Sequence, residues 1–422
     1  MKNVWNKIVL ALKDRSIRNR IFFVVFALVV FRLLSAIPVP GVDRIALEQY
    51  LGNNQFFGIL NMFSGGGFAT LSIVMLGVSP YITASIIMQL LTIIFPKVKE
   101  MYQENGEIGR QKFSTISRLL TVPLAILQGF GFIKLFVNQG VMGPFTPFEY
   151  FVNISIVVAG AMLVMWLGEL ITEYGIGNGA SMIIFAGIVA SFPTYVSQAL
   201  FSYEASQLPM YIGFIVVGVL IIAGVVLVSE AERPVPVTYA RQVRGIGSST
   251  PTYLPIRMNQ AGVMPIIFAL SLLLFPRLIG SALAASSNIT LVNIGETITR
   301  VFVDNQLVYG ILNFVLVVFF TYFYTAVTFD PDQVATNLQK NGAFIPGVRP
   351  GAPTAQFLSS VTVRITLFGS LFLGLIAVLP LITQSITGIT SMAIGGTALL
   401  IVVSVVTDLI KKIDAQISMR EY

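Results

Sequence analysis

Long apolar runs constrain this fold more than any other feature of the sequence. One of them, LSIVMLGVSPYITASIIMQLLTIIF, covers residues 71–95, and runs of similar length recur along the chain. A helix of roughly 20 such residues crosses the hydrocarbon core of a bilayer. Of the 422 residues, 55% are hydrophobic and 11% are charged, whereas soluble domains carry about 25% charged residues. The sequence therefore predicts a polytopic membrane protein.

Hydropathy predicts ten spans and hence an all-α fold. The spans cover residues 21–37, 71–95, 113–137, 150–168, 180–200, 210–229, 259–283, 306–329, 359–382 and 391–410. Because the number of spans is even, both ends of the chain are predicted on the same side of the membrane.

The distribution of basic residues predicts which side that is. Nineteen of the 26 Lys and Arg residues lie in the N-terminal segment, in segments 97–112, 230–258 and 330–357, and after residue 410. These segments share one side of the predicted topology, and basic residues close to span ends are retained in the cytoplasm. We therefore expect both termini to be cytoplasmic, in a multi-pass protein of the cytoplasmic membrane. The connection 168–179 departs from the rule, because it holds Glu169 and Glu173 but no basic residue.

The ten spans divide five and five, and an odd number of spans would turn a duplicated half upside down relative to its twin. Inverted repeats of this kind commonly enclose a pathway at their interface. We expect an N-terminal half over residues 1–205 and a C-terminal half over 206–422. The second half contains both long cytoplasmic loops, 230–258 and 330–357. No residue-level repeat relates the halves, so this prediction rests on topology.

Missing residue types exclude most catalytic chemistry. The chain contains no Cys and no His, which removes thiolate nucleophiles, imidazole bases and the usual zinc ligands. None of the 19 acidic residues lies at the middle of a predicted span, which argues against a proton-coupled carrier or an intramembrane aspartyl protease. The ATP-binding pattern GxxxxGK[ST] does not occur. We expect no enzymatic activity, no cofactor and no metal, but a passive path with an apolar constriction that is driven from outside.

Five strings resemble the SecY/Sec61-alpha family of protein-translocation channels, in the family's order and over nearly the whole chain. They are FRLLSAIPVPGVD (31–43), NMFSGGGFATLSIVMLGVSPYITASIIMQLL (61–91), MWLGELITEYGIGNGASMIIFAGIVA (165–190), YLPIRMNQAGVMPIIFA (253–269) and NLQKNGAFIPGVRPGAPT (337–354). The resemblance implies two inverted five-helix halves around a central pore. Unfolded secretory polypeptides would cross the cytoplasmic membrane through this pore, and hydrophobic segments would leave it sideways into lipid between spans 2 and 7.

The resemblance also implies partners. SecE and SecG would complete a heterotrimer, and the SecA motor or a translating ribosome would dock on the cytoplasmic loops. Signal peptides, nascent chains and membrane lipids would contact the channel itself.

A hydrophobic pore ring is implied position by position. Its members are Val78, Ile82, Ala180, Ile184, Ile267 and Ile401. The four-residue spacings in spans 2 and 5 place paired side chains on one helix face, as a constriction requires. Ala180 is smaller than the aliphatic residue usual at its position, which predicts a looser ring or a neighbour that substitutes for it. Periodicity alone does not distinguish these six from the many other apolar residues.

Residues of about 56–70 resemble the family's plug, a short half-helix that reaches back into the channel funnel. The plug positions are Phe63, Ser64, Gly65, Gly66, Gly67 and Phe68. Three consecutive glycines combine low helix propensity with wide φ and ψ freedom, which suits a segment that ends, turns and swings away. The alternative, from the residues alone, is a glycine-rich turn between two spans.

Polar residues at the implied gate and in the loops complete the candidate site. Gln89 and Asn259 lie in or near spans 2 and 7, where a helix-to-helix hydrogen bond worth about 0.6–2 kcal/mol would bias the gate. Their alternative is a partner within the same helix or a water molecule. Arg241, Arg244 and Arg349 lie in the two long loops and are implied in docking of SecA or the ribosome. They are equally explained as determinants of topology.

Two other functions fit the same topology. A facilitative small-solute carrier or flippase could be built from inverted halves of this kind. A membrane-insertion scaffold without a pore is the third reading. We expect co-purification with SecE and SecA or ribosomes from a channel, and binding of a small solute by an isolated monomer from a carrier.

Overall fold

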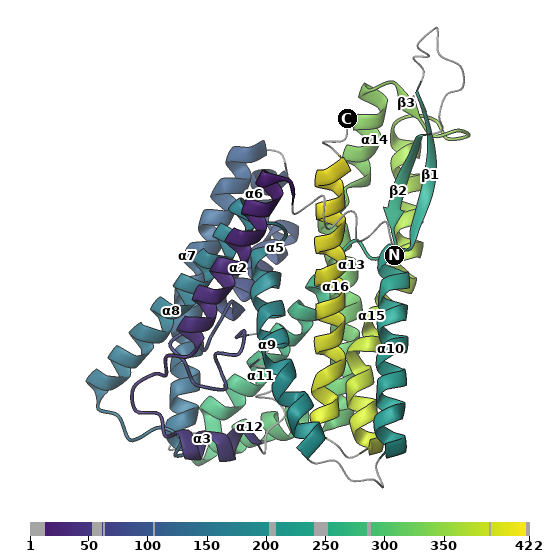
Figure 1. Ribbon diagram of the computed structural model, residues 1–422. Helices are drawn as coiled ribbons and strands as arrows, with labels where there is room; N and C mark the ends of the chain where they lie inside the picture. The colour runs from purple at the N-terminus through teal and green to yellow at the C-terminus, as the bar shows by residue number, and fades with distance from the viewer. Residues whose placement is uncertain are drawn as a thin grey trace.

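The computed structural model describes residues 13–52, 61, 64–103, 106–201, 208–239, 252–284, 288–387 and 390–418. Each of the ten predicted spans overlaps a helix in this part of the chain (Figure 1). These helices are α2 (Arg15–Ser35), α5 (Ser79–Ile94), α7 (Gly106–Asn138), α8 (Pro147–Tyr174), α9 (Gly179–Phe201), α10 (Leu208–Glu230), α11 (Met264–Ala284), α13 (Gln306–Thr328), α15 (Ala352–Thr387) and α16 (Thr390–Ser418). The expected all-α membrane fold is therefore confirmed.

Four helical segments of the described residues are long and apolar enough to cross a membrane by length and composition alone. They are Gly106–Asn138, Pro147–Tyr174, Gln306–Lys340 and Ala352–Leu379. A fifth is added when α5 and α6 (Pro96–Gln103), which meet at a bend of 115°, are taken as one broken span. Shorter apolar helices lie in Gly179–Pro193, Ile215–Glu230 and Met264–Leu273.

Short helices occupy several connections between the long ones. They are α3 (Arg44–Gly52), α12 (Ile289–Thr299), the π-helix η2 (Arg300–Asp304) and α14 (Pro331–Lys340). Local sequence explains where several helices begin. The carboxylate of Asp14 accepts hydrogen bonds from the first turn of α2, and Thr146 with Glu149 forms a capping box at the start of α8. Such side chains satisfy backbone N–H groups that have no partner within the helix.

The second span starts later than its hydropathy predicts. Residues 71–78 form turns, and helix α5 begins only at Ser79. Gly77 has a φ of +54°, a backbone conformation that ends regular structure, and Pro80 is favoured in the first helical turn because its missing N–H is not needed there. The prediction of a continuous helix over 71–95 is therefore wrong in its first eight residues.

The long helices pack in two groups; in Figure 1, α2, α7 and α8 of the first lie at the left and α10, α13, α15 and α16 of the second at the right, whereas α11 of the second group lies at the lower centre. In the first group α5 packs on α7, α7 on α8, and α8 on α2 and α9; in the second α13 packs on α11 and α15, and α16 packs on α10 and α15. Contacts between the groups join α11 to α5 and α7, and join α16 to α9. One large apolar cluster, with members on α2, α5, α8, α9, α10, α11, α13, α15 and α16, fills the space between them.

A three-stranded antiparallel sheet lies beyond the helix ends at the top of Figure 1. Strands β1 (Glu232–Tyr239) and β2 (Thr252–Arg257) come from the loop at 230–258, whereas β3 (Ala343–Phe344) comes from the loop at 330–357. The order is β2-β1-β3, with Thr238 paired to Phe344. The sheet was not predicted, and it joins two loops that are far apart in sequence.

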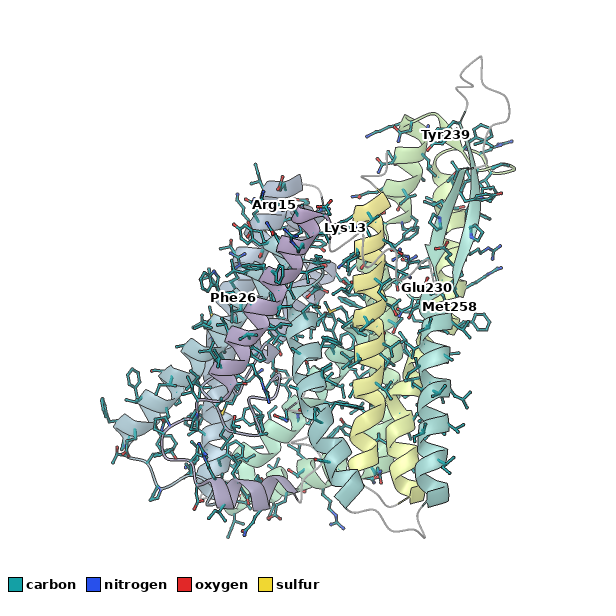
Figure 2. All side chains as sticks on the ribbon, viewed as in Figure 1. Lys13, Arg15, Phe26, Glu230, Tyr239 and Met258 are labelled. Carbon is teal, nitrogen blue, oxygen red and sulfur yellow. The ribbon has the colours of Figure 1, made fainter. Side chains whose placement is uncertain are left out.

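The two loops also share a small hydrophobic core with the first turns of α15. Its buried members are Val235, Ile256, Ile345, Leu358 and Val361. Lys13 and Arg15 lie at the upper end of the molecule in Figure 2, as does Tyr239 of the sheet. The N-terminal helix therefore begins at the end of the molecule where the sheet lies, as the predicted topology requires.

Candidate functional site

All six implied pore-ring residues belong to, or pack against, the same apolar cluster. Val78, Ile82, Ile184, Ile267 and Ile401 are all buried members of the large apolar cluster, and Ala180 packs against it. They belong to α5 and the residue before it, and to α9, α11 and α16, so both helix groups contribute. Ile184, Ile267 and Ile401 are at most 1% exposed. An apolar constriction of this composition would exclude water and ions, because neither can be solvated there.

Local backbone geometry explains the pairing of Val78 with Ile82 and the small side chain of Ala180. The amide of Ile82 donates to the carbonyl of Val78 over 3.0 Å, so these two side chains share one helix face as predicted. Ala180 follows Gly179, where an added Cβ would lie 1.8 Å from the carbonyl oxygen of Gly168. Helices α8 and α9 therefore approach closely, and the chain favours small residues at this point.

The implied plug is described in part. Phe63 lies outside the described residues, as do 53–60 and 62. Residues 64–70 form turns, and Ser64 to Phe68 are buried; most of the stretch in which the half-helix is expected lies outside the described residues, and Asn61 within it is helical. The turn is stabilised by the amide of Gly66, which donates to the carbonyl of Asn61 (2.7 Å), and by the amide of Phe68, which donates to Ser64 Oγ (2.9 Å).

The C-terminal end of the plug segment is anchored. Phe68 is 1% exposed, and its ring centroid lies 5.3 Å from that of Phe132 and 5.6 Å from that of Phe136, both on α7. Val39 donates its amide to the carbonyl of Leu71 (2.8 Å), which joins this segment to the chain that follows α2. These contacts hold Phe68 and Leu71 against α7 and the chain that follows α2.

The implied gate helices α5 and α11 pack against each other, but their predicted polar residues bond locally. Gln89 Nε2 donates to Ser85 Oγ on the same helix (3.2 Å), and Asn259 Nδ2 donates to the carbonyl of Gly262 (3.2 Å). The remaining side-chain oxygens of Gln89 and Asn259 are buried without a hydrogen-bond partner in the described structure. The alternative of a local partner therefore fits the structure better than a bond between the two helices.

Other buried polar residues, on the implied gate helices α5 and α11 and on the neighbouring α7, were missed from the sequence. Thr83 on α5, Gln128 on α7 and Ser271 on α11 are at most 4% exposed, and Ser271 Oγ has no hydrogen-bond partner among the described residues. These three helices meet at the interface between the two groups. A lone polar side chain within an apolar span is the signal that could have identified them.

Two ion pairs fasten helices at the end of the molecule that holds the sheet. Arg118 on α7 contacts Glu169 on α8 at 2.5 Å. This pair accounts for the connection that departs from the basic-residue rule, because the acidic group has its cation on the neighbouring helix. Lys411 on α16 contacts Glu230 at 2.9 Å. Figure 2 shows Glu230 beside Met258 where α10 meets the sheet, and the amide of Met258 donates to the carbonyl of Ala231 there (2.9 Å).

The implied docking arginines are described in part. Arg241 and Arg244 lie outside the described residues. Arg349 is exposed in the turn before α15, and its carbonyl accepts a hydrogen bond from Thr354 Oγ1 (2.8 Å). Its guanidinium is therefore presented on a loop that is held in place. Among the described residues, no group of three or more acidic, His or Cys side chains could hold a metal ion.

Comparison with known proteins shows the family to which this chain belongs. The SecY family matches residues 72–410 of this chain. The protein translocase subunit SecY of Thermus thermophilus is 39% identical over 449 residues, covering 100% of this chain and 97% of the relative. That of Streptomyces coelicolor is 40% identical over 435 residues, covering 98% of this chain and 97% of the relative.

Solved structures share the fold at lower sequence identity. One described as the structure of a protein conducting channel has a TM-score of 0.67 at 20% identity, covering 96% of this chain and 94% of its own. Sec61 in a canine ribosome-channel complex has a TM-score of 0.64 at 20% identity, with the same coverage. Since the family match extends over most of the chain and the relatives align along their whole length, this protein is a member of the SecY family.

Proposed function

We propose that this protein is the channel subunit through which unfolded secretory polypeptides cross the cytoplasmic membrane. The observation that carries the proposal is the meeting of Val78, Ile82, Ile184, Ile267 and Ile401, from both helix groups, in one buried apolar cluster. Relatives that align along the whole chain are named protein translocase subunits. Flexible aliphatic side chains block ions at rest by excluding water, and they can move aside for a polypeptide.

The packing between the two helix groups supports sideways release between α5 and α11. The groups are the proposed halves, residues 1–205 and 206–422. They meet through α11 with α5 and α7, and through α16 with α9. Buried oxygens of Gln89 and Asn259 without partners lie on α5 and just before α11. An unsatisfied buried oxygen costs about 1–3 kcal/mol, which these two residues would recover if opening let water reach them. The contact between α9 and α16 then acts as the hinge.

The joined cytoplasmic loops support docking of an external driver. Because β1 pairs with β3, a partner that binds Arg349 on one loop also acts on the other loop. Arg241 and Arg244 lie in the same loop as β1 and β2 and add two more basic residues to the joined loops. A solved structure of similar fold is Sec61 in a ribosome-channel complex. For this protein we propose SecA or a translating ribosome as driver, SecE and SecG as subunits, and signal peptides and nascent chains as clients.

A channel of this kind needs no catalytic group, and we propose that the chain has no enzymatic activity of its own. Both termini and the two loops are placed in the cytoplasm by the proposal, in line with the basic residues near the sheet. A small-solute carrier is less well supported, since its solute would need polar groups at the centre and the ring positions are apolar.

Reconstitution tests the proposed function. The chain would be purified with SecE and SecG, placed in lipid vesicles and supplied with SecA, ATP and a preprotein with a signal peptide. We expect the preprotein to become protected from added protease, and expect no protection when the signal peptide is removed. Absence of protection with active SecA and an assembled heterotrimer would refute the channel.

A further inference from the structure

The plug turn meets α9 backbone to backbone. A Cβ built at Gly187 on α9 would lie 2.2 Å from Cα of Gly65 and 2.5 Å from its carbonyl carbon. Real Cβ atoms essentially never approach other atoms closer than 3.0 Å. In this arrangement only glycine fits at position 187.

Gly65 and Gly66 lie in a narrow slot that has Gly187 of α9 on one side and Phe31 and Arg32 of α2 on the other. A Cβ at Gly65 would lie 2.3 Å from Cζ of Phe31, which is 1% exposed. A Cβ at Gly66 would lie 2.5 Å from Nη1 of Arg32. The two plug glycines also have φ angles of +68° and +92°, which side chains disfavour. The glycine turn therefore lies between Gly187 on α9 and the side chains of Phe31 and Arg32 on α2, and it fits there because the turn itself carries no side chains.

The slot lies close to the ring position Ile184. Gly187 follows Ile184 by three residues, close to one turn of α9. Phe68 fixes the C-terminal side of the turn on α7, so the position of the turn depends on how closely it can approach α9. A side chain at residue 187 would push the turn away from the helix that supplies Ile184.

We propose that Gly187 is a positioning residue for the plug, and that the volume at this position sets how tightly the resting channel is sealed. The inference rests on the proposed channel function. It assigns the three-glycine sequence a packing function in the closed state, in addition to the conformational freedom predicted from the sequence.

Resting ion conductance tests the proposal. Planar bilayers would contain the heterotrimer with Gly187→Ala or Gly187→Val, without SecA or preprotein. We expect conductance to rise by roughly tenfold for Ala, the order expected for overpacking a packed contact, and to rise further for Val. Gly213→Ala on α10 is the matched control, because an added Cβ there meets nothing within 4 Å; it should stay at the level of the unchanged protein.

A deletion of residues 60–68 separates a plug effect from a pore effect. The deletion alone should leak, and Gly187→Ala should add nothing to it, because the segment seated by Gly187 is gone. Equal increases in both backgrounds would mean that the substitution disturbs the ring, and would overturn the proposal. A tight Gly187→Ala channel would overturn it as well, whereas a failure of translocation by the unchanged protein would refute the channel function instead.

A second variant covers the case in which the α9 substitution prevents assembly with SecE. Gly65→Ala fills the same slot from the plug side, against Phe31, and changes no membrane helix. It should raise the resting conductance in the full-length chain. The resting conductance of Gly66→Ala should rise less, because its Cβ meets the end of the flexible Arg32 side chain. If both Gly187→Ala and Gly65→Ala channels stayed as tight as the unchanged protein, the proposed packing of the plug turn against α9 would be contradicted.

Discussion

Lys411 and Glu230 connect helix α16, which carries Ile401, to the base of the three-stranded sheet. Lys411 Nζ lies 2.9 Å from Glu230 Oε1 and donates to the carbonyl of Ser229 over 3.2 Å. Strand β1 begins at Glu232, and Ile401 lies ten residues before Lys411 on the same helix, a rise of about 15 Å. The ion pair therefore joins the base of the sheet to the helix that carries Ile401, and we expect it to couple movements of the two.

Removing the Lys411 contact should weaken this coupling. We expect Lys411→Gln to slow SecA-driven translocation about two- to fivefold, since a partly exposed ion pair contributes about 0.2–1 kcal/mol. Lys411→Arg should restore most of the rate. The matched control is Lys412→Gln, whose partner Asp408 lies on the same helix at 3.0 Å. Equal rates for the two Gln variants would contradict the coupling.

The pair Arg118 and Glu169 should stabilise the contact between α7 and α8. Arg118→Gln and Glu169→Gln should each lower the free energy of unfolding by about 0.5–1 kcal/mol, a value reduced because the arginine side chain is 46% exposed. Thermal unfolding of the detergent-solubilised protein measures this. The double variant should lose less than the sum of the single variants, because the two residues act on each other. Fully additive losses would show that the pair contributes nothing.

Opening between α5 and α11 should be required for transport. Because the chain contains no cysteine, introduced Cys pairs provide the only thiols in this subunit. A disulfide between facing positions of α5 and α11 should block translocation, and reduction should restore it. A disulfide between facing positions of α9 and α16, the proposed hinge, should have little effect. If export continued with the disulfide between α5 and α11 formed, these two helices would not be the lateral gate.

The long helices could be predicted because a membrane span leaves a local signal, a run of about 20 apolar residues. The late start of α5 depends on tertiary packing. Turns over residues 71–78 are stable at membrane depth because they are buried between helices of the first group. Hydropathy responds to apolar character, not to backbone conformation, so these turns were predicted as helix.

The sheet could not be predicted for a different reason. Strand β1 has the sequence ERPVPVTY, and its two prolines weaken the strand signal. Its partner β3 has only two residues and lies more than 100 residues away, with Thr238 Oγ1 donating to the carbonyl of Phe344 at a separation of 106 residues. Pairing over such a distance leaves no pattern within either segment.

The candidate site also combines residues that could be predicted from the sequence with contacts that depend on tertiary packing. The ring residues were selected by family resemblance, and the structure brings them into one cluster. The slot around Gly65 was not predicted, because a close approach between Gly65 and Gly187 is a property of the packed helices. The ion pair of Arg118 with Glu169 was missed for the same reason: its members are 51 residues apart.

The path of a translocating chain tests the central claim most directly. A preprotein carrying one cysteine would be stalled midway by a folded domain at its C-terminal end, in vesicles with the heterotrimer, SecA and ATP. Each channel would carry one cysteine, at Ile184→Cys or Ile267→Cys in the ring, or at Ile311→Cys on α13, a residue 58% exposed on the outer surface. We predict disulfides to the two ring positions and none to position 311. A stalled chain that crosslinks to position 311 and to neither ring position would contradict the proposed pore.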